Sequence, residues 1–293
     1  MKILVSGSSG FIGTALVSYL VQRGYEVVRL VRRSPTEGEI HWDPESGFID
    51  SASISGFDAV VNLAAESIVA GSWTIEQKAR IRDSRVKGTR LLTTTLSRME
   101  RPPTVLACAS SDVYYGDRGN EVLFESSGPG KTFLAGVSVE NENQALAARD
   151  AGTRVVNMRF GMVIGPTVAG MAGRFKKGLG GILGDGRHYI SWVTLDDAVR
   201  ATDHILNNPA LHGAVNIVAP NPVTNFEFTK TLGRILRRPT FLRRPSFLVK
   251  LLKGEMAEVE LISVRIDSNR LVSTGFRFND PELEGALRSV LGK

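Results

Sequence analysis

The sequence predicts an α/β protein: a doubly wound parallel sheet of the Rossmann type, with a smaller mixed C-terminal lobe. Three observations predict this class. The chain opens on a short apolar run, a glycine-rich turn and a helix-like stretch, in that order. Apolar runs of strand length then alternate with helix-length stretches, and this regularity ends near Gly165-Pro166. Alternating strands and helices favour a parallel sheet with right-handed crossovers.

The first strand is expected at Ile3-Leu4-Val5, and the turn that follows is Gly7-Ser8-Ser9-Gly10-Phe11-Ile12-Gly13. Its glycines have the spacing of a dinucleotide-binding turn. Gly7 suits the positive φ of a tight turn, Gly10 lets the backbone approach a pyrophosphate, and Gly13 lets the helix pack closely on the strand. Because a helix N-terminus offers unpaired N–H groups to phosphates, we expect residues 7–13 to bind a dinucleotide.

The later elements follow from periodicity and from turn residues. The run 58–65 is almost entirely apolar, as is typical of a strand buried on both faces of a parallel sheet. Residues 170–186 hold seven glycines, which is too many for a packed helix throughout, and fit either a flap over a pocket or a tight crossing. Further strands are expected at 26–31, 40–42, 104–109, 154–159 and 215–218, helices at 74–97, 134–151 and from 224, and a loop at 117–132.

We expect two structural parts. Residues 1–165 should form the nucleotide-binding domain, with residues 191–219 returning to it, and residues 166–190 and 220–293 should form a substrate-binding lobe.

The composition narrows the class of function. The net charge is +6, but the basic residues are dispersed and lack interleaved aromatics, so we expect no nucleic-acid partner. The chain has one cysteine and four histidines without metal-like spacing, so we expect no metal. No apolar run is long enough to span a bilayer, and the first strand begins at residue 3, so we expect a cytoplasmic protein with no membrane partner.

Several segments together resemble the extended short-chain dehydrogenase/reductase family: the glycine turn, the strand end Asn62-Leu63-Ala64-Ala65, the turn at 113–116 and the strand from Arg159 to Gly165-Pro166. More narrowly, the chain resembles the atypical subfamily of epimerase family, or sugar-nucleotide-epimerase-like, proteins through residues 84–89, 114–116, 178–184, 191–192 and 275–278. The resemblance implies an NADP-type cofactor beside the glycine turn and Leu63, Ala64 and Ala65. It also implies a small-molecule pocket in the second half, hydride-transfer chemistry and, in many relatives, a homodimer.

The end of the second strand distinguishes NADP from NAD. Arg32 and Arg33 follow that strand, with no acidic residue before Glu37. An acid there would bind the ribose 2′-hydroxyl, whereas an arginine suits a 2′-phosphate. We therefore expect NADP(H), although two arginines after a strand can also be simply solvated.

The resemblance implies a Tyr-x-x-x-Lys pair, yet none of the five tyrosines has a lysine four residues later. Leu134 and Ser138 stand where the family pattern places that pair. The remaining candidates are Ser110 and Tyr114, with Tyr114 as proton donor and Ser110 polarising the substrate oxygen. Alternatively, Ser110 and Ser111 cap the turn, and the tyrosines are packing residues.

On the substrate side, Met162 stands where nucleotide-sugar relatives have asparagine, which favours a smaller or more apolar substrate. The expected pocket residues are Ser111, Tyr115, Phe160, Met162 and Trp192. The sequence therefore predicts an NADP(H)-binding oxidoreductase or epimerase-like enzyme acting on a small molecule. The alternative is a non-catalytic NADP(H)-sensing or regulatory protein.

Overall fold

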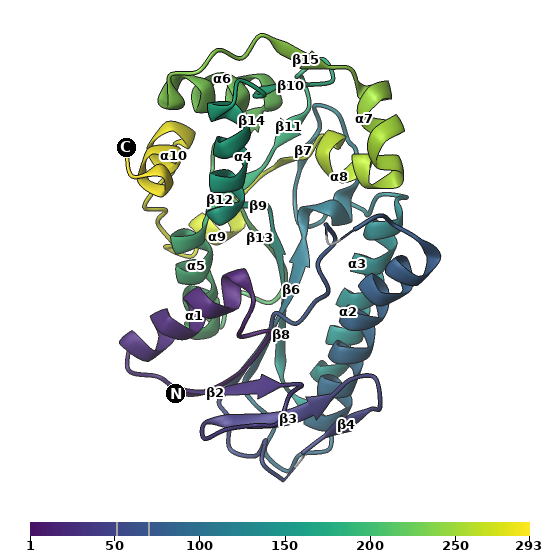
Figure 1. Ribbon diagram of the computed structural model, residues 1–293. Helices are drawn as coiled ribbons and strands as arrows, with labels where there is room; N and C mark the ends of the chain where they lie inside the picture. Colours follow the sequence, from purple (N-terminus) through teal and green to yellow (C-terminus); the bar gives the residue numbers. More distant parts are fainter. Residues whose placement is uncertain (51, 70) are drawn as a thin grey trace. The chain divides into compact units, whose positions relative to one another are not determined.

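A computed structural model describes residues 1–50, 52–69 and 71–293, which form two compact units (Figure 1). The first unit comprises residues 1–111, 136–159 and 199–215, and the second comprises residues 112–135, 160–198 and 216–293.

The first unit contains all or most of β1 (Lys2–Ser6), α1 (Phe11–Gln22), β2 (Glu26–Val31), β3 (Glu39–Asp43), β4 (Phe48–Ile49), β5 (Ala59–Asn62), α2 (Ile75–Leu96), β6 (Val105–Ser111), α3 (Phe133–Leu146), the 3-10 turn at Ala147–Ala151, β8 (Arg154–Phe160), α5 (Leu195–Asn207) and β13 (Gly213–Ile217). The large sheet has the strand order β13-β8-β6-β5-β1-β2-β3-β4. β1 is parallel to both β2 and β5, and β5 is parallel to β6, which confirms the predicted α/β class.

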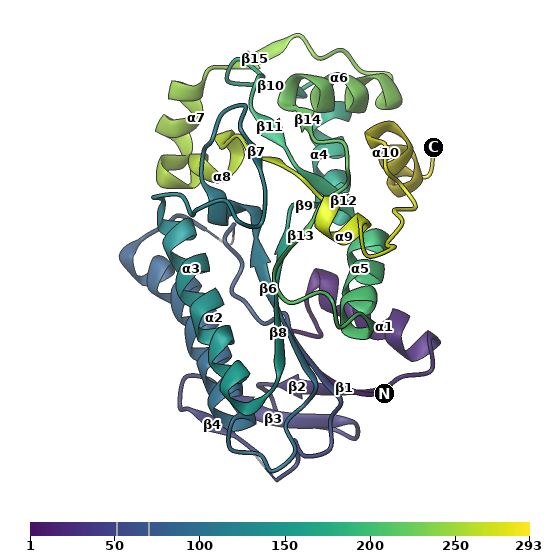
Figure 2. The same cartoon turned by 180° about the vertical axis from the view of Figure 1, so that it is seen from behind.

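Helices cover both faces of this sheet. Figures 1 and 2 show α1 and α5 on one side of the strands and α2 and α3 on the other. The core between sheet and helices includes Leu4, Trp42, Leu92, Leu106 and Cys108, each almost fully buried. Burial raises the pKa of the Cys108 thiol to about 12, so this cysteine packs as an apolar residue. β5 is buried along its whole length, as its apolar run predicts, but it ends at Asn62, before the end of the apolar run 58–65.

The second unit is built from short strand pairs and helices. Its elements are the 3-10 turn at Asp112–Tyr115, β7 (Val122–Leu123), β9 (Met162–Ile164), α4 (Pro166–Lys176), β10 (Gly181–Leu183), β11 (Tyr189–Ile190), β12 (Trp192–Thr194), β14 (Val223–Thr224), α6 (Asn225–Leu236), β15 (Leu242–Arg244), α7 (Ser246–Lys253), the 3-10 turn at Gly254–Met256, α8 (Ala257–Leu261), β16 (Arg265–Ile266), α9 (Asn269–Val272) and α10 (Leu283–Leu291). One apolar cluster gathers around Trp192, Phe228 and Leu232. A second gathers around Tyr115, Leu123 and Ile266.

The unit boundaries differ from the expected domains 1–165 with 191–219, and 166–190 with 220–293. Residues 112–135 belong to the second unit because β7 pairs with β16, and residues 160–165 belong to it because β9 pairs with β12. Of the segment 191–219, only residues 199–215 belong to the first unit. Pairings between segments 30 or more residues apart set these boundaries, and periodicity along the chain cannot report them.

The glycine-rich segment 170–186 is part helix and part strand. α4 extends to Lys176, Gly178 then turns the chain with a φ of +75°, and β10 begins at Gly181. Within the part of the chain that the structure describes, no helix is long and apolar enough to cross a membrane.

Candidate functional site

The glycine turn has a geometry that excludes side chains at two of its three glycines. Gly7 has a φ of +67°, and a Cβ built on it would lie 2.5 Å from the carbonyl carbon of Leu63. A Cβ on Gly13 would lie 2.1 Å from the carbonyl oxygen of Gly7. Gly7 therefore makes the tight turn and Gly13 allows the close packing of α1, the two roles that the sequence predicts for them.

The N-terminus of α1 is left without a side-chain cap. Its N-cap residue is Gly10, which has no side chain to accept a hydrogen bond, and the first turn contains no acidic residue. A helix of this kind keeps unsatisfied N–H groups and a partial positive charge at its start. The end of α1 next to the glycine turn is therefore suited to an anion.

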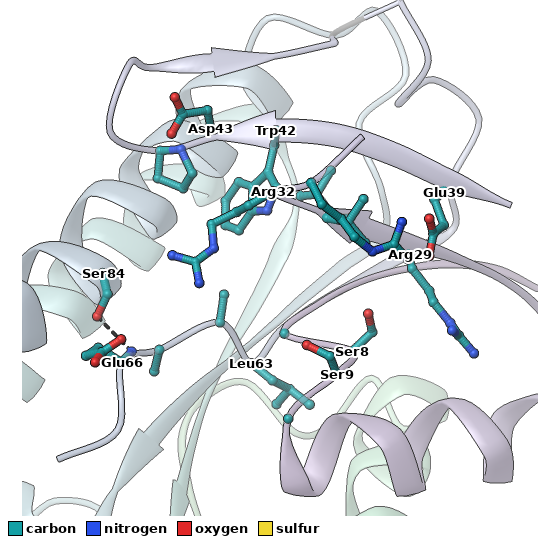
Figure 3. Close-up of a pocket in the computed structure, with 18 of the residues that line it drawn as sticks. Ser8, Ser9, Arg29, Arg32, Glu39, Trp42, Asp43, Leu63, Glu66 and Ser84 are labelled. Carbon is teal, nitrogen blue, oxygen red and sulfur yellow. Dashed lines mark hydrogen bonds and ion pairs between the residues drawn. The ribbon is translucent and has the colours of Figure 1, made fainter. Parts of the chain in front are cut away.

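A cavity of about 650 Å³ adjoins this turn within the first unit (Figure 3). Nine of the twelve predicted cofactor residues line it: Gly7, Ser8, Ser9, Gly10, Arg32, Arg33, Leu63, Ala64 and Ala65. The other three, Phe11, Ile12 and Gly13, form the first turn of α1 immediately after Gly10. The structure thus brings together segments up to 58 residues apart (Gly7 to Ala65) that the sequence assigned to one ligand.

The cavity also has lining residues that sequence reasoning missed: Thr14, Arg29, Leu30, Val31, Glu39, Trp42, Asp43, Pro44, Glu45, Glu66 and Ser84. Most of them lie at or just after the carboxyl ends of β2, β3 and β5. Ligands of open parallel sheets bind at these ends, so the short run Trp42-Asp43-Pro44 at the end of the expected third strand was an available signal.

The two predicted arginines have different surroundings. The Arg33 guanidinium donates to Glu39 Oε1 at 2.6 Å. Nothing in the described residues pairs with the Arg32 guanidinium, and Figure 3 shows it pointing into the cavity from the end of β2, in front of Trp42. Of the two, Arg32 is the cation that remains available to a ligand.

Glu39 is firmly ionised. Its Oε2 accepts hydrogen bonds from the backbone N–H of Thr36 at 2.9 Å and from Thr36 Oγ1 at 2.8 Å. These bonds, with that from Arg33, lower the pKa of Glu39 to about 2. The Arg33 charge is therefore already balanced by a carboxylate on β3.

The chain after β5 is anchored to α2. Ser84 Oγ accepts from the backbone N–H of Glu66 at 2.9 Å, and Arg85 donates to the carbonyl oxygens of Glu66 and Ile81. Burial lowers the pKa of Arg85 to about 10. Ser84 and Arg85 therefore fix the loop that forms one wall of the cavity.

A buried chain of hydrogen bonds runs behind this wall. Ser6 Oγ donates to Asn62 Oδ1 at 2.6 Å, Asn62 Nδ2 donates to Thr89 Oγ1 at 2.9 Å, and Thr89 Oγ1 donates to Asn141 Oδ1 at 2.7 Å. Asn141 Nδ2 in turn donates to the carbonyl oxygen of Ala109. β1, β5, α2, α3 and β6 are thereby tied together by satisfied polar groups.

Ser110 belongs to a second buried cluster, with Glu142 and Arg159. Arg159 is 3% exposed and donates from both Nε and an Nη to the two oxygens of Glu142, each at 2.8 Å. Ser110 Oγ donates its hydrogen to Glu142 Oε1 at 2.6 Å. A serine hydroxyl has a single proton, so Ser110 in this geometry can accept a hydrogen bond but cannot also donate one. The expected role of Ser110 in polarising a substrate oxygen does not fit this arrangement.

The positions of the missing Tyr-Lys pair are occupied by packing residues. Leu134 and Ser138 lie on α3 and are 4% and 9% exposed. Neither side chain has a group that transfers protons near neutral pH. Glu142 follows Ser138 by one helical turn, and its carboxylate is held by Arg159.

The tyrosines after β6 lie in the second unit. Tyr115 is fully buried and donates from its hydroxyl to Asn216 Oδ1 at 2.6 Å, so it is a core residue. Tyr114 is half-buried, with its ring edge-to-face against that of Tyr115. Tyr114 thus keeps partial access to solvent, whereas Tyr115 does not.

The other expected substrate residues are also either buried or half-buried. Trp192 is fully buried and donates from Nε1 to the carbonyl oxygen of Asn221, and Phe160 is 5% exposed. Both are interior residues of the second unit. Met162 packs at the margin of the Trp192 cluster, and Ser111, at the end of β6, is half-buried. Across residues 1–50, 52–69 and 71–293, the structure brings no three metal-ligating side chains together.

Comparison with known proteins places this architecture among relatives. The model of the NAD dependent epimerase/dehydratase family matches residues 3–218, and a domain of unknown function, DUF1731, matches residues 244–290. An epimerase family protein of Mycobacterium bovis is 40% identical over 291 residues, which cover 97% of this chain and 96% of that protein.

Two solved structures extend the likeness. Human epimerase family protein SDR39U1, crystallised with NADPH, matches with a TM-score of 0.91 and 32% identity over 100% of both chains. A nucleoside-diphosphate sugar epimerase from Corynebacterium glutamicum matches with a TM-score of 0.82 and 31% identity, covering 100% of this chain and 58% of that one.

Proposed function

The chain belongs to the NAD dependent epimerase/dehydratase family, and from this membership we propose that its first unit binds NADPH in the cavity beside the glycine turn. One observation carries the proposal: the uncapped start of α1 adjoins the same cavity as the Arg32 guanidinium, which has no partner among the described residues. The crystal structure of human SDR39U1 with NADPH supports it.

The residues fit the two anionic parts of this cofactor. Gly10, the N-cap residue of α1, has no side chain, so a pyrophosphate can approach the N–H groups at the start of α1. Arg32, at the end of β2, would hold the 2′-phosphate through charge-assisted hydrogen bonds. When bound, the nicotinamide ring of such a cofactor accepts or gives a hydride.

A fluorescence titration of the whole protein with NADPH and NADH tests the proposal. We expect NADPH to bind at least about tenfold more tightly than NADH, equivalent to about 1.4 kcal/mol. Equal affinities would contradict the role of Arg32. No binding of either nucleotide would overturn the proposal.

For chemistry, we propose an oxidoreductase or epimerase-like reaction on a small molecule, with Tyr114 as the proton donor. The half-buried position of Tyr114 supports this choice, because its neighbour Tyr115 is fully buried. Ser110 would contribute only as an acceptor, because its proton goes to Glu142.

A second function, a non-catalytic NADP(H) sensor, is favoured by Leu134 and Ser138, which cannot replace the Tyr-Lys pair. The two functions are separated by adding a metabolite mixture to the NADPH-loaded protein and following nicotinamide absorbance. Cofactor consumption that Tyr114→Phe reduces would support the enzyme. Unchanged absorbance with tight NADPH binding would support the sensor.

A further inference from the structure

The second unit exposes an unusual group of large apolar side chains around α7. Phe241 is 86% exposed, Leu251 78%, Leu252 75% and Phe247 71%. Together with the less exposed Leu242 and Leu248, these six residues are named here the α7 surface. Isolated exposed apolar residues are common, but six large ones within twelve residues of one chain segment are a concentration that indicates an interaction site.

α7 (Ser246–Lys253) is amphipathic, but its main apolar side is exposed and not buried. Phe247, Leu248, Leu251 and Leu252 follow the spacing of residues that share one side of a helix. Val249 is 5% exposed and supplies the buried contact of α7, which packs beside the 3-10 turn at Gly254–Met256 and α8 (Figures 1 and 2). The side of α7 that carries the four exposed residues therefore faces solvent, and the side that carries Val249 is buried.

The same segment is strongly basic. Residues 237–253 contain Arg237, Arg238, Arg243, Arg244, Lys250 and Lys253, and no acidic residue. Arg244 donates to the carbonyl oxygen of Leu179, and Lys253 pairs with Glu260. The other four are exposed and flank the apolar side chains along the chain.

We propose that the α7 surface rests on an anionic lipid membrane, with its phenylalanines and leucines in the interfacial layer and its arginines and lysines against the headgroups. Leucine and phenylalanine on one face, bordered by cations, is the composition of helices that lie in a membrane interface. The attraction to anionic lipid adds to the burial of the apolar side chains.

Charge and shape favour this partner over a second copy of the chain. A two-fold contact through the α7 surface would bring two such basic segments face to face, and like charges repel. The side chains are also 71–86% exposed at four positions, so they project outward instead of lining a groove. A lipid interface accepts projecting side chains without a matching cavity.

This proposal departs from the expectation of no membrane partner. That expectation followed from the lack of an apolar run long enough to span a bilayer, and within the described residues no helix could span one. A segment that lies on a membrane needs only one exposed apolar face, which becomes visible once the fold shows which side of α7 is buried.

Vesicle co-sedimentation of the full chain tests the proposal. We expect binding to vesicles of phosphatidylglycerol mixed with phosphatidylcholine, little binding to phosphatidylcholine alone, and release as salt is raised. Arg243→Ser with Lys250→Ser should weaken binding to the anionic vesicles and reduce its salt dependence. If the protein does not bind the anionic vesicles at low salt, the proposal is wrong.

The double variant Leu251→Glu, Leu252→Glu should lose vesicle binding at least about tenfold while keeping the melting temperature and NADPH affinity of the wild type, because both side chains are exposed. Val21→Glu, a change of the same type at a 56% exposed position on α1, is the control and should bind like the wild type. Equal vesicle binding by the double variant would overturn the proposal. A second result would also overturn it: the wild type forms a dimer and does not bind vesicles, and the double variant is a monomer. The α7 surface would then join two copies of the chain.

Discussion

Two groups of polar side chains in the first unit differ in how fully they are satisfied. At the cavity, Arg32 has no partner in the described residues, and α1 begins without a side-chain cap. At the ends of β6 and β8, Ser110, Glu142 and Arg159 satisfy one another through short hydrogen bonds. Polar groups left open at a surface cavity are suited to a ligand, whereas a closed buried cluster stabilises the fold.

The N-termini of α6 and α1 also differ in whether their N–H groups are satisfied by a side chain. In the second unit, Thr224 caps α6 with a full capping box: its side chain accepts from the N–H of Glu227, whose carboxylate accepts from the N–H of Thr224. α1 has a glycine at the equivalent place. A cap of this kind at α1 would contribute about 1 kcal/mol to stability, so its absence is understandable if an anion takes its place.

The largest effect is expected from opening the closed cluster. Glu142→Ala removes both oxygens that accept hydrogen bonds from Arg159 Nε and Nη2, and Arg159 is only 3% exposed. Removing one partner of a buried ion pair typically costs about 3–5 kcal/mol. Urea unfolding should show this loss, while the NADPH affinity of the folded protein should stay unchanged.

Glu140→Ala is the matched control for that variant. Glu140 lies two residues earlier on α3, with a side chain that is 34% exposed and paired with Arg82. A surface pair of this kind contributes about 1 kcal/mol or less. Equal losses for the two variants would show that the Glu142 cluster is no more important to the fold than a surface pair.

The next effect is expected at the glycine turn. Gly13→Ala places a Cβ 2.1 Å from the Gly7 carbonyl oxygen, so α1 must move away from the turn. We expect NADPH affinity to fall about a hundredfold, equivalent to about 2.7 kcal/mol. Gly136→Ala on α3 is the control, because its Cβ would meet nothing within 4 Å. If Gly13→Ala binds NADPH like the wild type, the turn does not hold the pyrophosphate.

A smaller effect should separate the two arginines. Arg32→Ala should weaken NADPH binding about tenfold, about 1.4 kcal/mol, with NADH binding unchanged, because only NADPH carries the 2′-phosphate. Arg33→Ala should have the smaller effect, because Arg33 is already paired with the ionised Glu39. Parallel titrations of both variants with both nucleotides measure this order, and a greater loss for Arg33→Ala would reverse the assignment.

The fold and the glycine turn could be predicted because their signals are local. The positive φ of Gly7 and the close approach at Gly13 leave only glycine possible, and a strand buried on both faces must be apolar. The expected strand at 26–31 has the observed bounds, and the helix expected at 74–97 lies at Ile75–Leu96.

The rest could not be predicted because it depends on contacts between distant segments. Ser110 and Glu142 are 32 residues apart, so nothing in the sequence shows that the serine proton is already taken. Tyr115 and Trp192 each have a polar edge that finds a partner in the second unit, Asn216 and the carbonyl oxygen of Asn221, and residue type does not show this. In both cases the sequence does not show which polar groups are satisfied, because that is a property of the folded chain.

The smallest effect is expected at Ser110 and bears on the chemistry. Ser110→Ala removes one hydrogen bond to Glu142, whose oxygens still accept both bonds from Arg159. We expect a loss of about 1 kcal/mol of stability and no change in NADPH affinity. Where a substrate supports cofactor consumption, Ser110→Ala should slow it less than Tyr114→Phe does. If Ser110→Ala slows cofactor consumption more than Tyr114→Phe does, the Ser110 hydroxyl must donate to the substrate during the reaction. Its hydrogen bond to Glu142 would then break, and the cluster would open.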